Sequence, residues 1–463
     1  MEQGETMRLT IIIIMLILLA GVQGASALVS NITVNSDKTI SIDEVKTFPM
    51  GMLLVCSYVW DDTTEPCETS LPKFNNFTFA IKAFGVAKPD DLVTYYTATI
   101  PKYEVTNVYF DVPGGSWDDT NRNLFNTSSR FFGYYQVPDE MLQANFTFLY
   151  NQYHSIASAG LNTTHPVIYT DWKNMTRAEQ VADILVTDQY SYEYGDTDGW
   201  DLDEFLFIKE HKLFNDYFRT GSNTFNAFDN ISKPVWFMFE GFGTNWNDGN
   251  DWRTFPNKNY LRAMTYWGIT ANGRGITYYG NKPPGNPTNG LWGNDTIRIW
   301  YNDFAGEIKS LNDILVLPNL NYSWGSYVTD NKVTFSNNPT KTIFSRERQY
   351  LTYALKNGTI NNYIIVVNRY NQTVQTYINV TGLTGTHNWT TLGNETSGSS
   401  RAGRTLTSTN GNITTIETFD PYAAHIYEIS SESAPPSGNA TTWTIRGSGG
   451  DATWSDYWYE GKP

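Results

Sequence analysis

The chain has 463 residues, of which 40% are hydrophobic, so it can form two or three globular domains and is not a disordered chain. Its 32 Lys and Arg residues are outnumbered by 47 Asp and Glu, and a net charge of −15 argues against a nucleic-acid partner because it repels phosphate backbones. The five histidines have no metal-ligand spacing. No phosphate-binding loop, dinucleotide fingerprint or serine-nucleophile elbow is present, so we expect neither a metal ion nor a cofactor.

The first 27 residues are typical of a secretion signal. Arg8 precedes an apolar run over residues 11–20, and Ala25-Ser26-Ala27 is a small-residue cleavage pattern. The run is too short to favour a membrane span, and no later stretch is long and apolar enough to cross a bilayer. We therefore expect a secreted, extracellular or cell-surface protein without a membrane span in the mature chain.

Cysteines and glycosylation motifs agree with export. Cys56 and Cys67 are the only cysteines, and an oxidising compartment would let them form a disulfide; two unpaired thiols are the alternative. Asn-x-Ser/Thr sequons predict N-glycosylation of solvent-facing surface, although a chain rich in Asn and Thr forms some by chance. The sixteen sequon asparagines are Asn31, Asn76, Asn126, Asn145, Asn162, Asn174, Asn230, Asn294, Asn321, Asn357, Asn371, Asn379, Asn388, Asn394, Asn412 and Asn439.

From residue 48 to about 317, short apolar runs alternate with helical periodicity, which predicts a parallel α/β fold. The polar segment before it, residues 28–45, is expected to be an exposed lead-in strand. Seven strands are predicted at residues 50–55, 107–110, 131–135, 167–170, 184–187, 235–240 and 276–279. An eighth strand is expected between residues 67 and 102, where no pattern places it.

Two helices are clear between these strands. Apolar residues at steps of three and four form one stripe over residues 142–156, and Gly160 is a stop signal. A second stripe covers residues 304–315 and ends before Pro318. The tryptophan-containing segment 241–256 follows a strand, and in a barrel such a loop lies at the active face.

Beyond about residue 322 the helical spacing disappears. Apolar runs at residues 363–367, 375–380 and 424–429 alternate with Asn, Gly and Thr turns, which predicts a β-sandwich. The expected architecture is a (β/α)8 barrel followed by an all-β sandwich. Its parts are a signal peptide at 1–27, a lead-in strand at 28–45, the barrel at 46–320, the sandwich at 321–430, and a linker with a C-terminal tail at 431–463.

Two glutamates stand where apolar strands stop, Glu140 and Glu240. The C-terminal ends of barrel strands converge on one mouth, so residues a hundred apart in sequence face each other there. Cleavage of a glycosidic bond needs such a pair, one carboxylic acid to protonate the leaving oxygen and one carboxylate at the anomeric carbon. A single strand-end glutamate is more often an ion-pair partner or a helix N-terminal charge, and Glu140 is open to that interpretation.

Further polar and aromatic residues near strand ends are candidates for substrate binding. Aspartates there can bind sugar hydroxyls or cap a loop, and a tryptophan in a loop offers a flat stacking surface. These candidates are Asp111, Asp171, Asp188, Tyr190, Tyr192, Trp246 and Trp292.

An ordered set of motifs resembles barrel glycosidases of the glycoside hydrolase superfamily that carry catalytic glutamates on strands four and seven. The segments that carry the resemblance are residues 47–52 (TFPMGM), 132–135 (FGYY) followed by Asp139-Glu140, 165–167 (HPV), 182–184 with 188–190, 233–236 (KPVW), and 262–266 with 273–276. The resemblance covers residues 47–317. It implies that Glu140 is the acid/base and Glu240 the nucleophile of a retaining mechanism.

The sequence therefore predicts a secreted glycoside hydrolase that acts on an oligosaccharide or polysaccharide. A non-catalytic, glycosylated surface or carbohydrate-binding protein on the same scaffold, associated with a cell envelope, is the alternative. Asp139 favours that alternative, because the better-studied relatives have Asn before the acid/base. A transferase that uses the same two glutamates is a third hypothesis.

Overall fold

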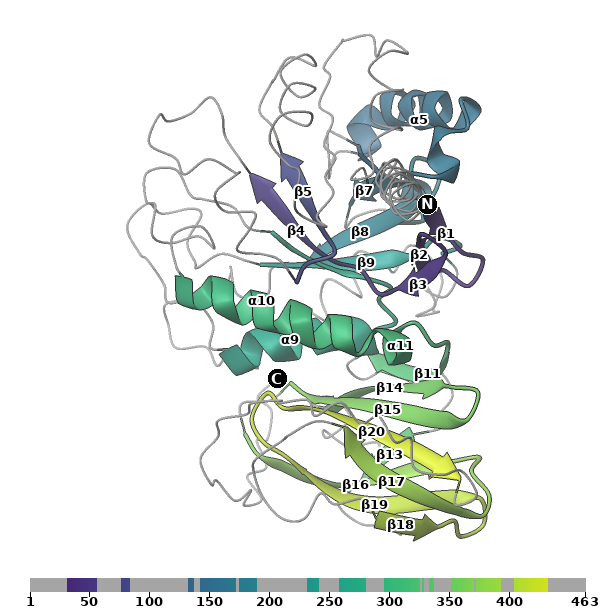
Figure 1. Ribbon diagram of the computed structural model, residues 1–463, viewed down its shortest axis with the longest axis vertical. Helices are drawn as coiled ribbons and strands as arrows, with labels where there is room; N and C mark the ends of the chain where they lie inside the picture. Colours follow the sequence, from purple (N-terminus) through teal and green to yellow (C-terminus); the bar gives the residue numbers. More distant parts are fainter. Residues whose placement is uncertain are drawn as a thin grey trace, which may run out of the picture.

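A computed structural model of the chain describes residues 31–55, 76–83, 132–136, 142–171, 175–189, 231–240, 258–279, 295–324, 327–328, 333–336, 351–369, 372–392 and 404–431. The expected signal peptide, Cys56, Cys67 and the tail after residue 431 lie outside this part. The described chain forms an upper unit with a parallel sheet and a lower unit of antiparallel sheets, with helices between them (Figure 1).

The upper unit contains a seven-stranded sheet in which every pair of neighbours is parallel. Its strands are β4 (Met50–Val55), β5 (Phe79–Ala83), β6 (Tyr134–Tyr135), β7 (Val167–Thr170), β8 (Ile184–Gln189), β9 (Val235–Glu240) and β10 (Ile276–Tyr279). Their spatial order is β5-β4-β10-β9-β8-β7-β6. The first of these strands along the chain thus pairs with the last, as in a barrel, and the order is interrupted only between β5 and β6.

The predicted strands agree well with this sheet. Four have the predicted bounds, β8 extends two residues further, and β6 is shorter than the predicted strand at 131–135. The strand that no pattern placed is β5, whose apolar character is broken by Lys82. The predicted strand at 107–110 lies outside the described residues.

The sheet is strongly curved. In a flat sheet, β5 and β9 are three strand spacings apart, about 14 Å, and the β5 and β6 edges are roughly 29 Å apart. Yet the ring of Phe79 on β5 is 5.1 Å from that of Trp236 on β9, and 4.8 Å from that of Phe132, which lies two residues before β6. Opposite edges of the sheet therefore approach each other around an enclosed aromatic cluster.

Alternate residues of each strand pack on different sides. Trp236 and Met238 of β9 belong to the enclosed cluster with Ile184 and Val186 of β8. Phe237 and the other outward residues pack in a larger cluster with the helices. On β4, Gly51 faces inward, since a Cβ atom there would lie 2.0 Å from the Phe79 ring. The ring fills the space that a side chain would need.

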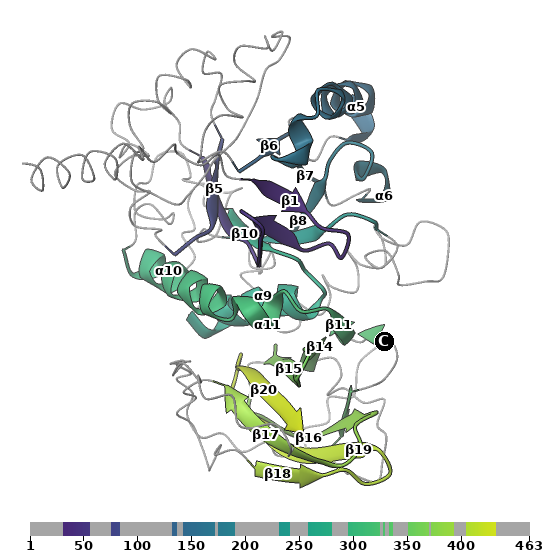
Figure 2. The ribbon, with the colours of Figure 1, turned by 45° about the vertical axis from the view of Figure 1, so that its right-hand side comes forward.

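The segment expected to be an exposed lead-in strand is instead a small antiparallel sheet that closes one end of the curved sheet (Figure 2). It contains β1 (Ile32–Val34), β2 (Ile40–Ile42) and β3 (Val45–Thr47). Ile32 and Ile40 are buried in the enclosed cluster, and the Ile32 N–H donates to Thr164 O before β7. The expectation of an exposed strand was wrong because Ile32 and Ile40 are brought together only when the strands of this small sheet pair. The N-terminal ends of the parallel strands are thereby covered.

The helices of the upper unit are α5 (Leu142–Ser158), α6 (Met175–Ala178), α9 (Lys258–Thr270), α10 (Asp295–Ser310) and α11 (Asn312–Leu315), with a 3-10 turn, η2 (Leu161–Thr163). The predicted stop at Gly160 is confirmed, since its φ of 71° is left-handed and favours glycine. No helix in the described ranges is both long and apolar enough to span a membrane.

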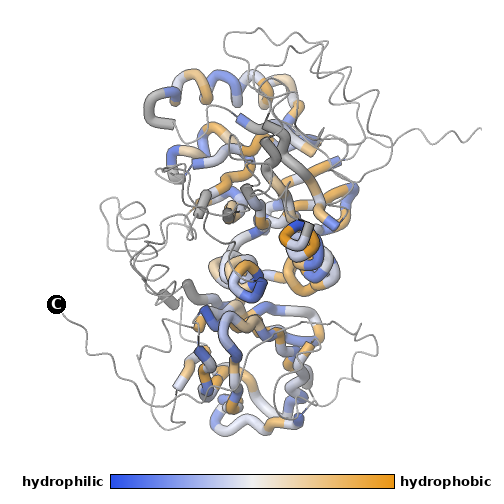
Figure 3. The backbone as a smooth tube through the Cα atoms, turned by 90° about the vertical axis from the view of Figure 1, so that its left-hand side faces the viewer, coloured by the Kyte–Doolittle hydropathy of each residue, from blue (hydrophilic) through white to orange (hydrophobic). Residues whose placement is uncertain are grey.

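The lower unit consists of two antiparallel sheets where the sequence predicts a β-sandwich. One has the order β12-β11-β14-β15-β20-β17-β18, and the other β13-β16-β19. The strands are β11 (Asn319–Trp324), β12 (Tyr327–Val328), β13 (Val333–Ser336), β14 (Leu351–Asn357), β15 (Asn361–Asn368), β16 (Val374–Thr381), β17 (Thr386–Leu392), β18 (Arg404–Thr407), β19 (Asn412–Phe419) and β20 (Ala424–Ser431). Buried residues of both sheets form one cluster. Hydrophobic and hydrophilic residues are interspersed along both units, as expected for elements that bury one face (Figure 3).

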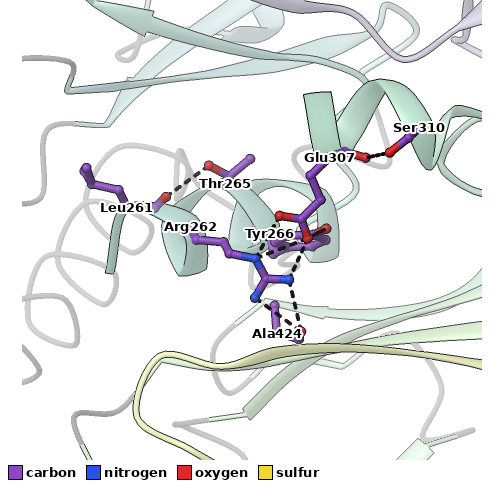
Figure 4. Close-up of polar contacts among 7 residues, drawn as sticks. All are labelled: Leu261, Arg262, Thr265, Tyr266, Glu307, Ser310 and Ala424. Atoms are coloured by element: carbon purple, nitrogen blue, oxygen red, sulfur yellow. Dashed lines mark hydrogen bonds and ion pairs between the residues drawn. The ribbon is translucent and has the colours of Figure 1, made fainter. Parts of the chain in front are cut away.

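Helix α9 lies between the two units and packs on both. All residues from Tyr260 to Thr270 are buried, and residues of β15 and β20 belong to the same apolar cluster as the helix. A polar group spans the same boundary (Figure 4). Arg262 Nη2 donates to Glu307 Oε1 at 2.6 Å and the guanidinium also reaches Ala424 O of β20, while the Tyr266 hydroxyl donates to Glu307. Burial and the nearby Glu307 carboxylate raise the pKa of Tyr266.

We predict that Arg262→Met lowers the free energy of unfolding by about 3–5 kcal/mol, because it leaves the Glu307 carboxylate without its charged partner. Lys258→Met on the same helix is the matched control. Its pair with Asp303 is exposed, so the change should stay below about 1 kcal/mol. Urea unfolding measures both, and equal effects of the two substitutions would contradict the role given to the buried pair.

A second prediction concerns His165, which is fully buried before β7. Burial lowers its pKa from 6.5 to about 4, so the folded chain keeps this ring neutral while the unfolded chain takes up a proton. Protonation of this residue in the unfolded chain should therefore lower the free energy of unfolding by about 3 kcal/mol as the pH is lowered from 7 to 4. His165→Asn should make urea stability less dependent on pH in that window. An unchanged slope would show that other groups cause the acid sensitivity.

The sequons differ in their exposure. Asn321 is only 1% exposed and accepts a hydrogen bond from the Tyr353 hydroxyl, so its burial argues against the glycan expected at this sequon. Asn31 and Asn357 are exposed. Partly buried sequon asparagines are Asn76, Asn145, Asn162, Asn379, Asn388 and Asn412. Those outside the described residues are Asn126, Asn174, Asn230, Asn294, Asn371, Asn394 and Asn439.

We predict that Asn321 stays unmodified when the chain is expressed through a glycosylating secretory pathway, whereas Asn357 carries a glycan. Peptide mass spectrometry after enzymatic deglycosylation in heavy-oxygen water distinguishes the two sites in one sample. A glycan on Asn321 in folded, monodisperse protein is the result that would refute the burial argument.

Candidate active site

The C-terminal ends of the parallel strands all lie at one edge of the curved sheet, opposite the end that β1 to β3 cover. In such sheets, binding and catalytic residues gather at the C-terminal edge. Two predicted site residues are terminal or near-terminal residues of their strands, Asp188 of β8 and Glu240 of β9. We call this edge the mouth.

Glu240 is the last residue of β9. Its backbone is in register with Tyr279 of β10, the last residue of that strand. Because Trp236 and Met238 lie in the enclosed cluster, alternation along β9 places position 240 on the enclosed face, one step beyond Met238 toward the mouth.

Asp188 occupies a comparable position on the neighbouring strand. It is in register with Met238, and it follows Ile184 and Val186 on the enclosed face of β8. The structure thus places positions 188 and 240 on one face of adjacent strands. In parallel α/β sheets, residues at neighbouring strand ends can act on one ligand.

Asp171 does not share that face. It directly follows β7, is 2% exposed, and donates its backbone N–H to Val186 O at 3.0 Å. Because side chains alternate along a strand, Asp171 is on the same side of β7 as Tyr169, which packs in the outer cluster with the helices. Ile168, which packs in the enclosed cluster, is on the other side. The structure therefore gives no support to a direct contact between Asp171 and a substrate.

The other candidates lie outside the described residues. They are Asp111, Glu140, Tyr190, Tyr192, Trp246 and Trp292. For Glu140, the structure describes the strand that leads to it: Gln136, just after β6, donates its backbone N–H to Ile168 O of β7. The described chain therefore leaves β6 at the same edge of the sheet at which β9 ends.

Sequence reasoning did not single out one buried hydroxyl residue near this edge. Thr277 of β10 is completely buried and in register with Met238, one step below the Tyr279–Glu240 pair. A hydroxyl residue inside an otherwise apolar and aromatic strand, Ile-Thr-Tyr-Tyr, was the available signal. Its Oγ1 has no hydrogen-bond partner among the residues that the structure describes.

No group of His, Cys, Asp or Glu side chains that could hold a metal ion occurs within the described ranges. The polar residues near the strand ends at this edge include the carboxylic acids Asp188 and Glu240 and the hydroxyl residues Thr277 and Tyr279. Such groups can transfer protons, attack an electrophilic carbon or bind sugar hydroxyls.

Searches against protein-family models and against curated proteins gave no match. Among solved structures, the chain is similar to a glycoside hydrolase family 30 endoxylanase from Clostridium papyrosolvens, with 11% identity, a TM-score of 0.40, and coverage of 87% of this chain and 100% of that one. It is also similar to an Anoxybacillus α-amylase, with 12% identity, a TM-score of 0.45, and coverage of 84% and 100%. An acarbose-bound α-amylase from Geobacillus thermoleovorans has 10% identity, a TM-score of 0.43, and coverage of 84% and 100%.

These similarities are too weak to assign a fold or an activity. The function proposed below rests on the chain's own strand order, strand register and residue types.

Proposed function

We propose that this protein is a glycoside hydrolase whose upper unit is a complete (β/α)8 barrel. Counting along the sheet from β4, the gap between β5 and β6 leaves room for one strand, which we assign to residues 107–110. β6 then takes the fourth position and β9 the seventh. The observation that carries the proposal is Glu240 at the mouth end of β9, on the face of Trp236 and Met238.

In the proposed mechanism Glu240 attacks the anomeric carbon and Glu140 protonates the leaving oxygen. A glycosyl-enzyme intermediate forms, and water, activated by Glu140, then hydrolyses it. This retaining reaction requires the two carboxyl groups to be about 5–5.5 Å apart, whereas an inverting reaction needs roughly 6.5–9.5 Å. A general acid must stay protonated at neutral pH, which requires a raised pKa. We therefore expect the pKa of the Glu140 carboxyl group to be raised.

We also infer the setting of the enzyme. The signal-like segment at 1–27 and the sequons support secretion, with a disulfide between Cys56 and Cys67. We infer a barrel over 46–320 and a sandwich over 321–430, followed by a linker and tail. A carbohydrate is the inferred partner, because paired carboxylates and loop aromatics suit a sugar chain.

The alternative function is a non-catalytic surface or carbohydrate-binding protein on the same scaffold. Asp139, in the place where the better-studied relatives have Asn, favours this alternative. Under it, Glu240 is a structural or sugar-binding residue and no bond is cleaved.

The test is a screen of the purified protein on aryl glycosides and polysaccharides, with Glu140→Gln and Glu240→Gln. We expect Glu240→Gln to abolish hydrolysis of every substrate. Glu140→Gln should abolish cleavage of substrates with poor leaving groups and retain binding, because only the proton donor is lost. Glu44→Gln is the matched control, since Glu44 is exposed on the small sheet at the opposite end of the barrel.

Two results would contradict the proposal, and the second would favour the non-catalytic alternative. One is full activity of both glutamine variants. The other is absence of hydrolysis by the wild-type protein together with Glu140 and Glu240 carboxyl groups more than about 10 Å apart in a crystal structure, which is beyond both mechanistic ranges.

A further inference from the structure

The outward face of the smaller sheet of the lower unit, β13-β16-β19, has no charged side chain along its described strands. Val374, Ile378 and Val380 of β16 pack in the core of the lower unit, so the alternate residues of this strand face outward. Together with the outward residues of β13 and β19, these residues are all Thr, Ser, Asn, Gln, Tyr or Ile. Covering such a face desolvates no charged group, so the face suits a neutral partner.

The centre of this face is apolar and open to solvent. Tyr377 of β16 is half-buried, and it is in register with Ile416 of β19, which is 45% exposed. The two side chains leave apolar surface in contact with water, which is unfavourable. Hydroxyl and amide side chains surround the pair on all three strands. A flat ring with a polar surround matches a sugar, which has an apolar C–H side and a polar rim.

A glycosylation motif lies on the same face, next to the ring. Its asparagine, Asn379, comes two residues after Tyr377, and its hydroxyl residue, Thr381, comes two residues later. Alternate residues of a strand share one side, and successive ones on that side are about 7 Å apart. A second sequon asparagine, Asn412, is in register with Thr381. A sugar attached to Asn379 therefore begins within reach of the Tyr377 ring.

The contacts of Asn379 are compatible with modification of its amide nitrogen. Its Oδ1 accepts a hydrogen bond from Thr414 Oγ1 of β19 at 3.0 Å, which holds the amide group across the face. Its Nδ2 donates to Thr334 Oγ1 of β13 at 3.5 Å, which is longer than a usual hydrogen bond. A sugar on Nδ2 therefore displaces a weak contact at most and leaves the stronger one in place.

We propose that an N-linked glycan at Asn379 covers this face and that the C–H side of its first sugar packs on the Tyr377 ring. The sugar replaces water over Tyr377 and Ile416, while its hydroxyl groups meet the polar side chains around them. The glycan is then part of the folded lower unit and stabilises it. This inference rests on the export inferred above, and it is independent of glycosidase activity.

The test is a double-mutant cycle on protein expressed through a glycosylating secretory pathway. Urea unfolding is measured for wild type, Asn379→Gln, Tyr377→Thr and the double variant, after glycopeptide mass spectrometry has determined the occupancy of Asn379. Threonine at position 377 keeps the strand preference and removes the ring. We expect loss of the glycan to lower the folded-to-unfolded ratio about three- to ten-fold more with Tyr377 than with Thr at that position.

Asn388→Gln is the matched control. Asn388 belongs to a sequon on β17 and is half-buried, and its Oδ1 accepts a hydrogen bond from Thr405 Oγ1 at 3.1 Å on the neighbouring strand. The residue two positions before it is Thr386, so the sequon has no ring at the corresponding position. Loss of this glycan should have the same effect with and without Tyr377. Equal coupling of Tyr377 to both sequons would overturn the proposal, because it would show a general sensitivity to glycan loss.

A second measurement needs no variant of the sequon. The rate at which tetranitromethane nitrates Tyr377 in the folded wild-type protein is compared before and after enzymatic removal of the glycans, with peptide mass spectrometry as the readout. We expect nitration to become several-fold faster once the sugar is removed, because the ring is then open to the reagent.

Three results overturn the proposal. One is an unmodified Asn379 in folded, secreted protein, and another is additive effects of the two substitutions together with unchanged nitration. The third is a wild-type dimer that Tyr377→Thr dissociates, because a second copy of the chain would then cover the face.

Discussion

The upper unit depends on the backbone pairing between β4 and β10, which joins residues 50–53 to residues 276–279. This pairing removes two sheet edges, and it brings the first strand of the sheet beside the last. Once it forms, the sheet must curve, the rings of Phe79, Phe132 and Trp236 meet, and all strand C-termini point to one end. A contact across more than two hundred residues is costly in chain entropy, so burial of the aromatic cluster and of the outer helical layer must offset it.

The same pairing determines the place of the sandwich. α9 connects β9 to β10, and its other side lies against β14, β15 and β20. The helix is buried nearly all round because it is covered on two sides, and Arg262 on it is satisfied by Glu307 of α10 and by a backbone carbonyl of β20. A shared apolar core and the contact of the Arg262 guanidinium with Ala424 O join the two units directly, so the sandwich is not merely tethered to the upper unit.

This arrangement has a consequence for the mouth. β9 and β10, which carry Glu240 and Thr277, are strands that α9 covers, so the sandwich supports the part of the sheet that contains position 240. Precise chemistry needs groups that are held by rigid elements and by the residues behind them. Tyr278 does this from the outer side, with its ring against Tyr301 and its hydroxyl on Thr265. The enclosed side then presents Thr277 and position 240 in a fixed register.

The sequence by itself determined the local elements. The bounds of β4, β7, β9 and β10, the helical stripe of α5 and its stop at Gly160 follow from apolar periodicity and from backbone preferences, which act over a few residues. The sequence also placed Glu240 at a strand end, which is a local property. Only the tertiary structure decided which strands are neighbours, that Ile32 and Ile40 are buried, that Asn321 is hidden behind Tyr353, and that Thr277 and position 240 share a face that Asp171 does not. Those facts depend on contacts between residues far apart in the chain. An apolar pattern with a period of two or 3.6 residues predicts a strand or a helix, but it carries no information about which other element that strand or helix packs against.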